Sequence, residues 1–222
     1  MSKIKTTHVG SLPRSNELSD LLFKKDQKEK INLNQFDEIR DNLINYAYDL
    51  QKKNPVSIGS SEHEAWDYCH PLEGWQSPRF KVNHKNNDLL QNYLISILSQ
   101  LDFIKESVGM KVTTWMNINA KNNLSVKHDH PGSVLSGVLW VKCYKNCGRI
   151  VFDNPLTFQS FNEISSYKGE FAKKNNYCHS YFFNPIEGRM LIFPSYLQHH
   201  VEVNNSEEDR ISISFNIDLI NG

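Results

Sequence analysis

The second half of the chain is a succession of short apolar segments, and this pattern limits the possible folds more than any other feature. After Gly109, eight segments rich in β-branched and aromatic residues alternate with turn-forming residues. The segments span residues 112–118, 124–130, 134–141, 149–152, 177–183, 189–194, 199–203 and 210–219. Eight strands within about 110 residues are typical of an antiparallel barrel or a two-sheet jelly roll. We therefore predict a mainly β structure of this kind.

The front of the chain predicts helices that support the β structure. Apolar residues recur with helical spacing over Asn34–Leu50, where Asn34 is a good N-cap, and Pro55 follows. A second apolar stripe runs over Leu90–Ile104, with Asp88 as its cap. Residues 54–87 have no helical period, and we expect loops there with one or two short strands. The predicted class is mainly β with α (α+β).

Length and charge set bounds on the type of protein. The 222 residues suffice for one substantial domain with an extension, and we divide them into an N-terminal helical extension (1–55) and a β domain (56–222). The formal charge of zero argues against nucleic acid as the main partner. The apolar runs are too short to cross a bilayer, and the first residues contain no apolar signal region. We expect a cytoplasmic protein without a membrane partner.

The four cysteines suggest no zinc site. Cys143 and Cys147 are separated by three residues, a loose spacing for zinc, and no second closely spaced pair accompanies them. We expect reduced structural thiols.

The last predicted strand, residues 210–219, alternates strictly between polar and apolar residues, which indicates two different environments. The polar positions are Arg210, Ser212, Ser214, Asn216 and Asp218, and the apolar positions are Ile211, Ile213, Phe215, Ile217 and Leu219. We expect the apolar face to pack on the helices at the front of the chain. The polar face either meets water or lines a wet cavity inside the barrel, where a polar ligand would lie.

The preceding strand predicts a neighbour for Arg210. If a hairpin turns at Asn204 and Asn205, residue types that suit tight turns, His199 lies directly opposite Arg210. A neutral histidine gains nothing beside an arginine unless both bind one ligand. The hairpin therefore predicts a histidine on a metal and an arginine on a carboxylate of the same ligand.

The stretch KHDHPG contains a second histidine pattern. In a strand, His128 and His130 point to the same side, whereas Asp129 points to the other. With His199 from a distant strand, three imidazoles could bind one iron, zinc or copper ion. The alternative is that both histidine segments are solvated loops. The predicted neighbourhood of His199 and Arg210 favours the metal site.

Four ordered motifs carry a resemblance to a known family. They are HDHP with SGVLWV, then GRIVFDNP, then GRMLIFPSYLQHHV, and finally RISISFN. From Gly74 to Leu219 the chain resembles the 2-oxoglutarate and iron(II)-dependent oxygenases of bacteria and many phages. The resemblance implies a double-stranded β-helix (jelly roll). It also implies O2 activation at Fe(II), decarboxylation of 2-oxoglutarate to succinate, and hydroxylation of a second substrate.

The resemblance also implies roles for single residues. His128 matches the first metal ligand and His199 the distal one, while Arg210 and Ser212 match the pair that binds the distal carboxylate of 2-oxoglutarate. A guanidinium can donate two parallel hydrogen bonds to a carboxylate, and a neighbouring hydroxyl can donate a third. The wider superfamily has a carboxylate where this chain has His130. Either three histidines bind the metal, or water fills that position.

Other features complete these expectations. Asn117 precedes the metal-binding segment and could contact the co-substrate, and no separate catalytic residue is predicted. About the first forty residues, beginning with the stretch KIKTTHVGSLPRSNELSDLL, resemble the start of cobalamin-independent methionine-synthase-like barrels, but the chain is too short for such a barrel. The expected partners are O2 and a small-molecule or peptidyl substrate, and a homodimer is compatible with them. The alternative function is a non-redox metal-binding cupin-like module or an isomerase, which would not need the pair Arg210 and Ser212.

Overall fold

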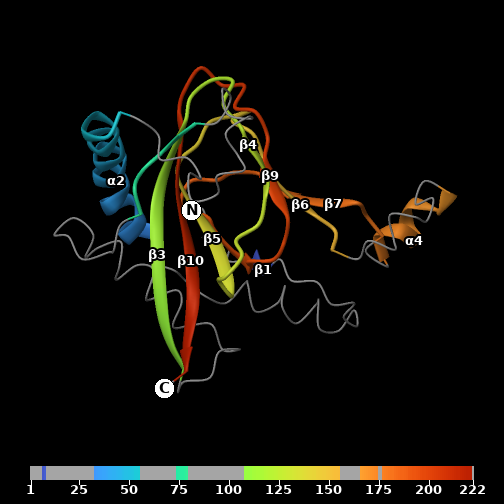
Figure 1. The fold of residues 1–222 in the computed structure, drawn as a ribbon. Coiled ribbons are helices and arrows are strands. Elements are labelled where there is room, and N and C mark those ends of the chain that lie inside the picture. The colour runs from blue at the N-terminus through green and yellow to red at the C-terminus, as the bar shows by residue number, and fades with distance from the viewer. Residues whose placement is uncertain are drawn as a thin grey trace.

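The computed structural model describes residues 7–8, 33–55, 74–79, 108–155, 166–174 and 177–221. Two β sheets form the body, and helix α2 (Leu33–Lys53) lies along the outside of the larger sheet (Figure 1). None of the helices in these ranges is long and apolar enough to cross a membrane.

The larger sheet has six strands in the order β1-β8-β5-β10-β3-β2. They are β1 (Thr7–His8), β2 (Trp75–Gln76), β3 (Val108–Asn119), β5 (Leu135–Lys142), β8 (Met190–Pro194) and β10 (Arg210–Asn221). All neighbours are antiparallel except β1 and β8, which are parallel.

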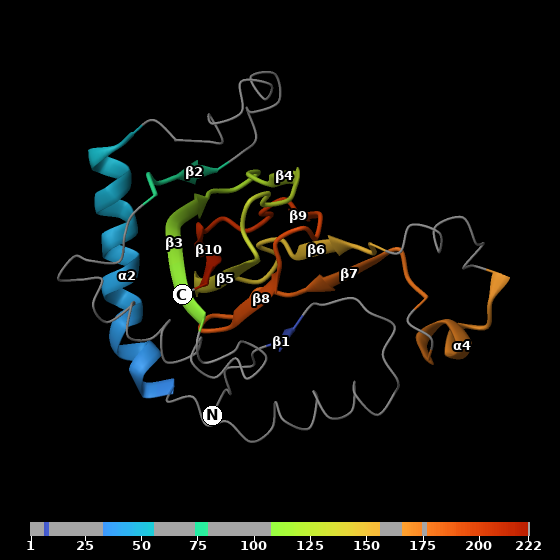
Figure 2. The ribbon, with the colours of Figure 1, turned by 60° about the horizontal axis from the view of Figure 1, so that its bottom comes forward.

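The smaller sheet has four antiparallel strands in the order β4-β9-β6-β7. They are β4 (Ser125–His128), β6 (Ile150–Asp153), β7 (Ser180–Phe183) and β9 (His199–Val201). From β3 to β10 the chain passes back and forth between the two sheets, which defines a double-stranded β-helix. Strands β6 and β7 lead away from the body to the short helix α4 (Gly169–Lys174), as Figure 2 shows.

The predicted elements agree with this fold. Each of the eight predicted segments overlaps a strand, which confirms the jelly-roll class, and the predicted helix over 34–50 is α2. The short strand β2 lies in the region where we expected loops with one or two strands. The predicted helix over residues 90–104 lies outside the described residues, and so does most of the segment 1–32. The domain boundary at residue 55 therefore stays a prediction.

The apolar face of β10 packs on α2, as the alternation predicted. Four of its side chains belong to one buried cluster with Leu43 and Ala47 of the helix. These four are Ile211, Ile213, Phe215 and Ile217. Burying one such side chain contributes about 1.5–3 kcal/mol, so this contact is a main source of stability for the larger sheet.

The polar face of β10 consequently points between the two sheets. Ser212 lies opposite Trp140 of β5, which belongs to the apolar cluster between the sheets. Further along the strand, Ser214 Oγ accepts a hydrogen bond from Asn117 Nδ2 (2.9 Å), and Asn216 Oδ1 accepts one from Ser136 Oγ (2.8 Å). Of the two environments that the sequence left open, the structure selects the interior.

The predicted hairpin between residues 199–203 and 210–219 is wrong. Strand β9 pairs with β4 and β6 in the smaller sheet, whereas β10 pairs with β3 and β5 in the larger one. Arg210 lies opposite Asn119, not His199. The reason is Asn204, which is 0% exposed and donates through Nδ2 to the carbonyl oxygens of Asn119 and Glu208. This anchor makes residues 202–209 a crossing between the sheets in place of a tight turn.

Candidate metal centre

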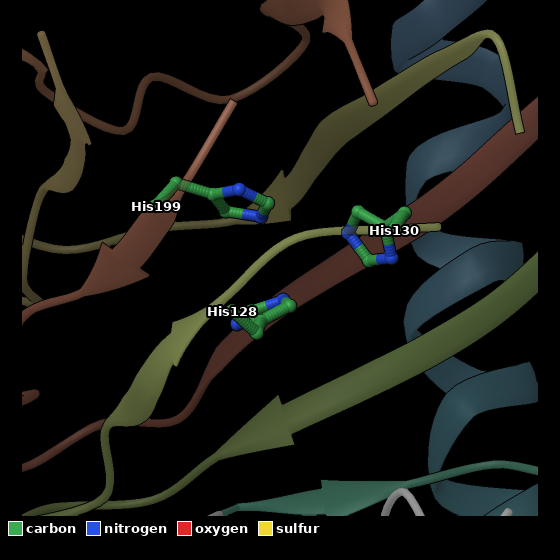
Figure 3. Close-up of side chains that lie close together, drawn as sticks. All are labelled: His128, His130 and His199. Carbon is green, nitrogen blue, oxygen red and sulfur yellow. The ribbon is translucent and has the colours of Figure 1, made fainter. Parts of the chain in front are cut away.

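Three histidines converge in the interior, and their rings are drawn in Figure 3. His128 ends β4 and lies directly opposite His199, the first residue of β9. The ring centroids are 4.4 Å apart for His128 and His199, 5.0 Å for His128 and His130, and 5.2 Å for His130 and His199. One ring nitrogen from each histidine lies within 4.8 Å of the others, so the three can hold one metal ion. Asp129 is not a member of this group.

His130 joins the cluster by a different route from the predicted one. Strand β4 ends at His128, so strand alternation does not orient His130. Its backbone N–H donates to Ser195 O at 2.9 Å, which ties the loop after β4 to the connection between β8 and β9. The predicted proximity of the two histidines is correct, and its cause is a tertiary hydrogen bond.

Two of the histidines have their outer nitrogen held by the backbone. His128 Nδ1 lies 2.7 Å from Val126 O, and His199 Nδ1 lies 2.8 Å from Leu197 O. A carbonyl oxygen only accepts, so each Nδ1 carries the proton in the neutral ring. Each Nε2 then keeps its lone pair. Metal-binding histidines commonly show this arrangement, in which the second ring nitrogen fixes tautomer and orientation.

Burial keeps two of the histidines, His130 and His199, unprotonated. Burial lowers the pKa of His130 to about 3, helped by the nearby charges of His128 and Arg79. Burial likewise lowers the pKa of His199 to about 3, with the charge of His128 as the next cause. Neutral imidazole is the form that binds metals, so protons compete weakly for this site at neutral pH.

Aromatic rings supply much of this burial. The Trp115 ring lies 5.8 Å from His130, and the Phe152 and Phe193 rings lie 5.5 Å and 4.9 Å from His199. Phe152 and Phe193 belong to the same apolar cluster as Trp140, which faces the inner side of β10. The histidines and the polar face of β10 therefore border one interior.

Arg210 is the most unusual side chain of this interior. It is 2% exposed, and burial lowers the pKa of its guanidinium, although arginine remains charged at neutral pH. Within the described ranges it forms no ion pair, and its hydrogen bonds run from Nη1 to Cys147 O and, at 3.5 Å, to Gly148 O. A buried cation without a carboxylate partner is costly, so an anionic ligand would stabilise this position.

The other predicted co-substrate residues lie on the same face. Ser212 is buried two residues after Arg210, and Asn117 lies opposite Ser212 in the neighbouring strand β3. The structure thus brings Arg210, Ser212 and Asn117 together. Their role in binding a co-substrate stays a prediction.

The sequence did not reveal which backbone segment contacts the Arg210 guanidinium. Gly148 has φ of 86°, and a Cβ there would lie 2.2 Å from Glu202 O and 2.8 Å from Arg210 Nη1, so its own conformation and the neighbouring backbone require glycine. Turn residues at Asn146 and Gly148 were the available signal, but only the fold shows which side chain their loop contacts.

The fold and the histidine cluster define the class of protein: a double-stranded β-helix with a candidate metal centre between its sheets. Within this class, the model of the family described as "Putative 2OG-Fe(II) oxygenase" matches residues 113–216 of the chain. The matched segment contains all three histidines, Arg210 and Ser212. No curated protein matches the chain significantly.

Two solved structures illustrate the likeness in fold. A prolyl-4-hydroxylase from Pseudomonas putida is 9% identical, with a TM-score of 0.54 over 82% of this chain and 87% of that one. A prolyl hydroxylase from Trichoplax adhaerens, in complex with a peptide fragment of the hypoxia inducible factor oxygen degradation domain, is 11% identical. Its TM-score is 0.56, over 82% of this chain and 78% of that one. Identities this low show a shared fold alone.

Proposed function

We propose that the protein is a 2-oxoglutarate and Fe(II)-dependent dioxygenase that hydroxylates a second substrate and converts 2-oxoglutarate to succinate. The observation that carries this proposal is Arg210, a buried guanidinium without a carboxylate partner in the described ranges. It faces the interior that the histidine cluster borders. A simple metal-binding module has no use for such a cation, whereas a dicarboxylate co-substrate needs one.

The donor set fits ferrous iron. His128, His130 and His199 would hold the ion, because each offers one ring nitrogen in one small region. When bound, iron supplies the O2 chemistry that no protein side chain provides. The carbonyls that accept from His128 and His199 would keep these two rings oriented.

Charge supports a dianionic co-substrate. Three neutral imidazoles add no negative charge, whereas the common set of two histidines and one carboxylate adds one. An ion held by this cluster would keep its full double charge, and Arg210 adds a further positive charge. A 2-oxoglutarate dianion would compensate most of this charge. Arg210 would bind its distal carboxylate, with the Ser212 hydroxyl as a second donor and Asn117 beside it.

The part of the interior that the metal ion and 2-oxoglutarate would leave free has to orient the second substrate and exclude water. Trp115, Phe152 and Phe193 already surround two of the histidines with apolar rings, which limits access of solvent. One of the similar folds was solved with a peptide fragment, which supports a peptidyl substrate, and a free small molecule is also compatible. A cytoplasmic location and a homodimer remain expectations from the sequence.

The missing carboxylate ligand favours one other candidate function. A cluster of three histidines without an acidic member also suits a non-redox metal-binding module or an isomerase of cupin type. The two functions differ in their requirement for 2-oxoglutarate.

Succinate formation tests the proposal. Protein loaded with Fe(II) should convert 2-oxoglutarate to succinate slowly under air without a second substrate, and faster with a suitable one. Omission of Fe(II), argon in place of air, or the variant His199→Ala should each stop the conversion. Metal-loaded protein that neither binds 2-oxoglutarate nor forms succinate would favour the binding module.

A further inference from the structure

The inner face of β10 becomes more open along the strand. Arg210 and Ser212 at its start are 2% and 6% exposed, whereas the Asp218 side chain near its end is 34% exposed. The pairing of β10 with β5 ends at Ile217, but its pairing with β3 continues to Asn221, so these two strands run on together past β5 (Figure 1). The interior is therefore most accessible at the Asp218 end of β10.

The histidine cluster lies level with the middle of this strand. The Trp115 ring, which is 5.8 Å from the His130 ring, belongs to the residue opposite Ser214. Asp218 follows Ser214 by four residues on the same face, which corresponds to about 13 Å along the strand. A molecule bound at Asp218 can therefore extend toward the metal centre from the open end.

Asp218 has a carboxylate oxygen without a partner. Its Oδ1 is buried and accepts no hydrogen bond in the described part of the chain. Its Oδ2 lies 3.8 Å from Lys111 Nζ, and the Lys111 side chain is 60% exposed. An exposed ion pair of this length contributes little to stability, whereas a buried oxygen without a donor is unfavourable. A donor from a bound molecule would satisfy Oδ1.

Asn216 offers a hydrogen-bond donor on the same face of the strand. Its Oδ1 accepts from Ser136 Oγ at 2.8 Å, and Ser136 Oγ lies 2.8 Å from Ser195 Oγ. Both serines are 1% exposed, so this network fixes the orientation of the amide. Among the residues that the structure describes, the Asn216 Nδ2 group has no acceptor, so it can donate to a bound molecule.

We propose that Asp218 and Asn216 bind the second substrate, and that this substrate carries a cationic amine or guanidinium, as in a lysyl or arginyl residue. Asp218 Oδ1 accepts from the cation, and Asn216 Nδ2 donates to a carbonyl oxygen of the substrate. A carboxylate binds a charged donor more strongly than a neutral one, which favours a cation over a hydroxyl or an amide. The role of this site in turnover rests on the proposed function, whereas its preference for a cation does not.

NMR titration of small probes tests the preference without turnover. The full chain is loaded with Zn(II), and N-acetyl-L-arginine amide is compared with its neutral analogue N-acetyl-L-citrulline amide. The arginine probe should bind about tenfold more tightly, as expected for one charge-assisted hydrogen bond. Equal affinity of the two probes, or binding of neither, would overturn the proposal.

Variants assign the preference to Asp218. Asp218→Asn should remove it, and Lys111→Gln should bind the arginine probe at least as tightly as the wild type, because a competing cation is lost. Asp153→Asn is a matched control that should keep the preference. The Asp153 side chain is also 34% exposed and lies 2.6 Å from Lys127 Nζ, but it belongs to the smaller sheet. An unchanged preference in Asp218→Asn with wild-type circular dichroism, or weaker binding in Lys111→Gln, would refute the assignment.

Succinate formation links the site to turnover. With Fe(II), 2-oxoglutarate and air, the arginine probe should increase succinate formation and gain one oxygen atom by mass spectrometry, whereas the citrulline probe should do neither. Preferential binding of the arginine probe without this increase would refute a role in substrate binding. Failure of the protein to bind 2-oxoglutarate at all would instead contradict the proposed function and leave the cation site valid.

Discussion

Replacement of Arg210 by alanine should separate metal binding from co-substrate binding. The guanidinium is buried, and within the described ranges it donates hydrogen bonds to two backbone carbonyls and has no carboxylate partner, so a bound carboxylate would not compete with an acidic side chain. Loss of a charge-assisted contact of this kind costs about 1.5–3 kcal/mol. Since about 1.4 kcal/mol corresponds to a factor of ten, the affinity for 2-oxoglutarate should fall roughly ten- to hundredfold.

The assay is calorimetric titration of 2-oxoglutarate into Mn(II)-loaded protein, in which no turnover occurs. Arg210→Lys should recover only part of the affinity, because an ammonium cannot form the two parallel hydrogen bonds of a guanidinium. Arg149→Ala is a matched control. Arg149 is the neighbour of Gly148 but is half-exposed and bound to Glu202, with Nε–Oε2 and Nη2–Oε1 distances of 2.8 Å and 2.6 Å, so its loss should leave the affinity unchanged.

The variant must keep its fold for this comparison, which circular dichroism and Mn(II) stoichiometry can check. Equal affinity for 2-oxoglutarate in the wild type and in folded, metal-binding Arg210→Ala would refute the clamp. It would also remove the main argument for an oxygenase over a binding module.

Three further predictions concern the histidines and the loop beneath Arg210. His199→Ala should abolish stoichiometric Fe(II) binding and His130→Ala should weaken it, whereas the control His200→Ala, at the adjacent residue, should retain it. Elemental analysis measures the metal content, and an unchanged content in His199→Ala would show that His199 is not a metal ligand. In metal-free protein the pKa values of His130 and His199 are about 3, below their ordinary 6.5, so the unfolded chain takes up more protons between these values. The free energy of unfolding should therefore be highest above pH 6.5 and fall by on the order of several kcal/mol as the pH drops toward 3. Equal urea midpoints at pH 7 and pH 4 would contradict this expectation. Gly148→Ala should lower the melting temperature, because φ of 86° disfavours a side chain and the added Cβ would lie 2.2 Å from Glu202 O. The same Cβ would lie 2.8 Å from Arg210 Nη1, so 2-oxoglutarate binding should also weaken, and normal affinity in this variant would argue against binding of the carboxylate at Arg210.

The positions of the strands could be predicted because they depend on local alternation. Each segment after Gly109 carries its own pattern of side chains, and a strand needs no more than this to define its two faces. The strict alternation of residues 210–219 even identified the face that packs on α2, since a row of isoleucines and a phenylalanine has to be buried. His128 and His199 were predicted from residue types and motif order, and the structure places them together, whereas the role of Arg210 stays a prediction.

The pairing of strands depended on the tertiary structure. The tight hairpin at Asn204 and Asn205 was compatible with the local sequence, but the Asn204 side chain bonds to the backbone of Asn119, which is 85 residues away. No local pattern can encode such a contact, so the membership of β9 and β10 in different sheets was not predictable.

The same limit applies to the candidate site. The sequence by itself determined which residue types could bind a metal and a carboxylate, because these are properties of single side chains. Only the tertiary structure decided that His130 reaches the cluster through the Ser195 carbonyl and that Arg210 rests on the backbone of Cys147 and Gly148. Both contacts join segments that are distant in the chain, and their geometry arises from the packing of the two sheets.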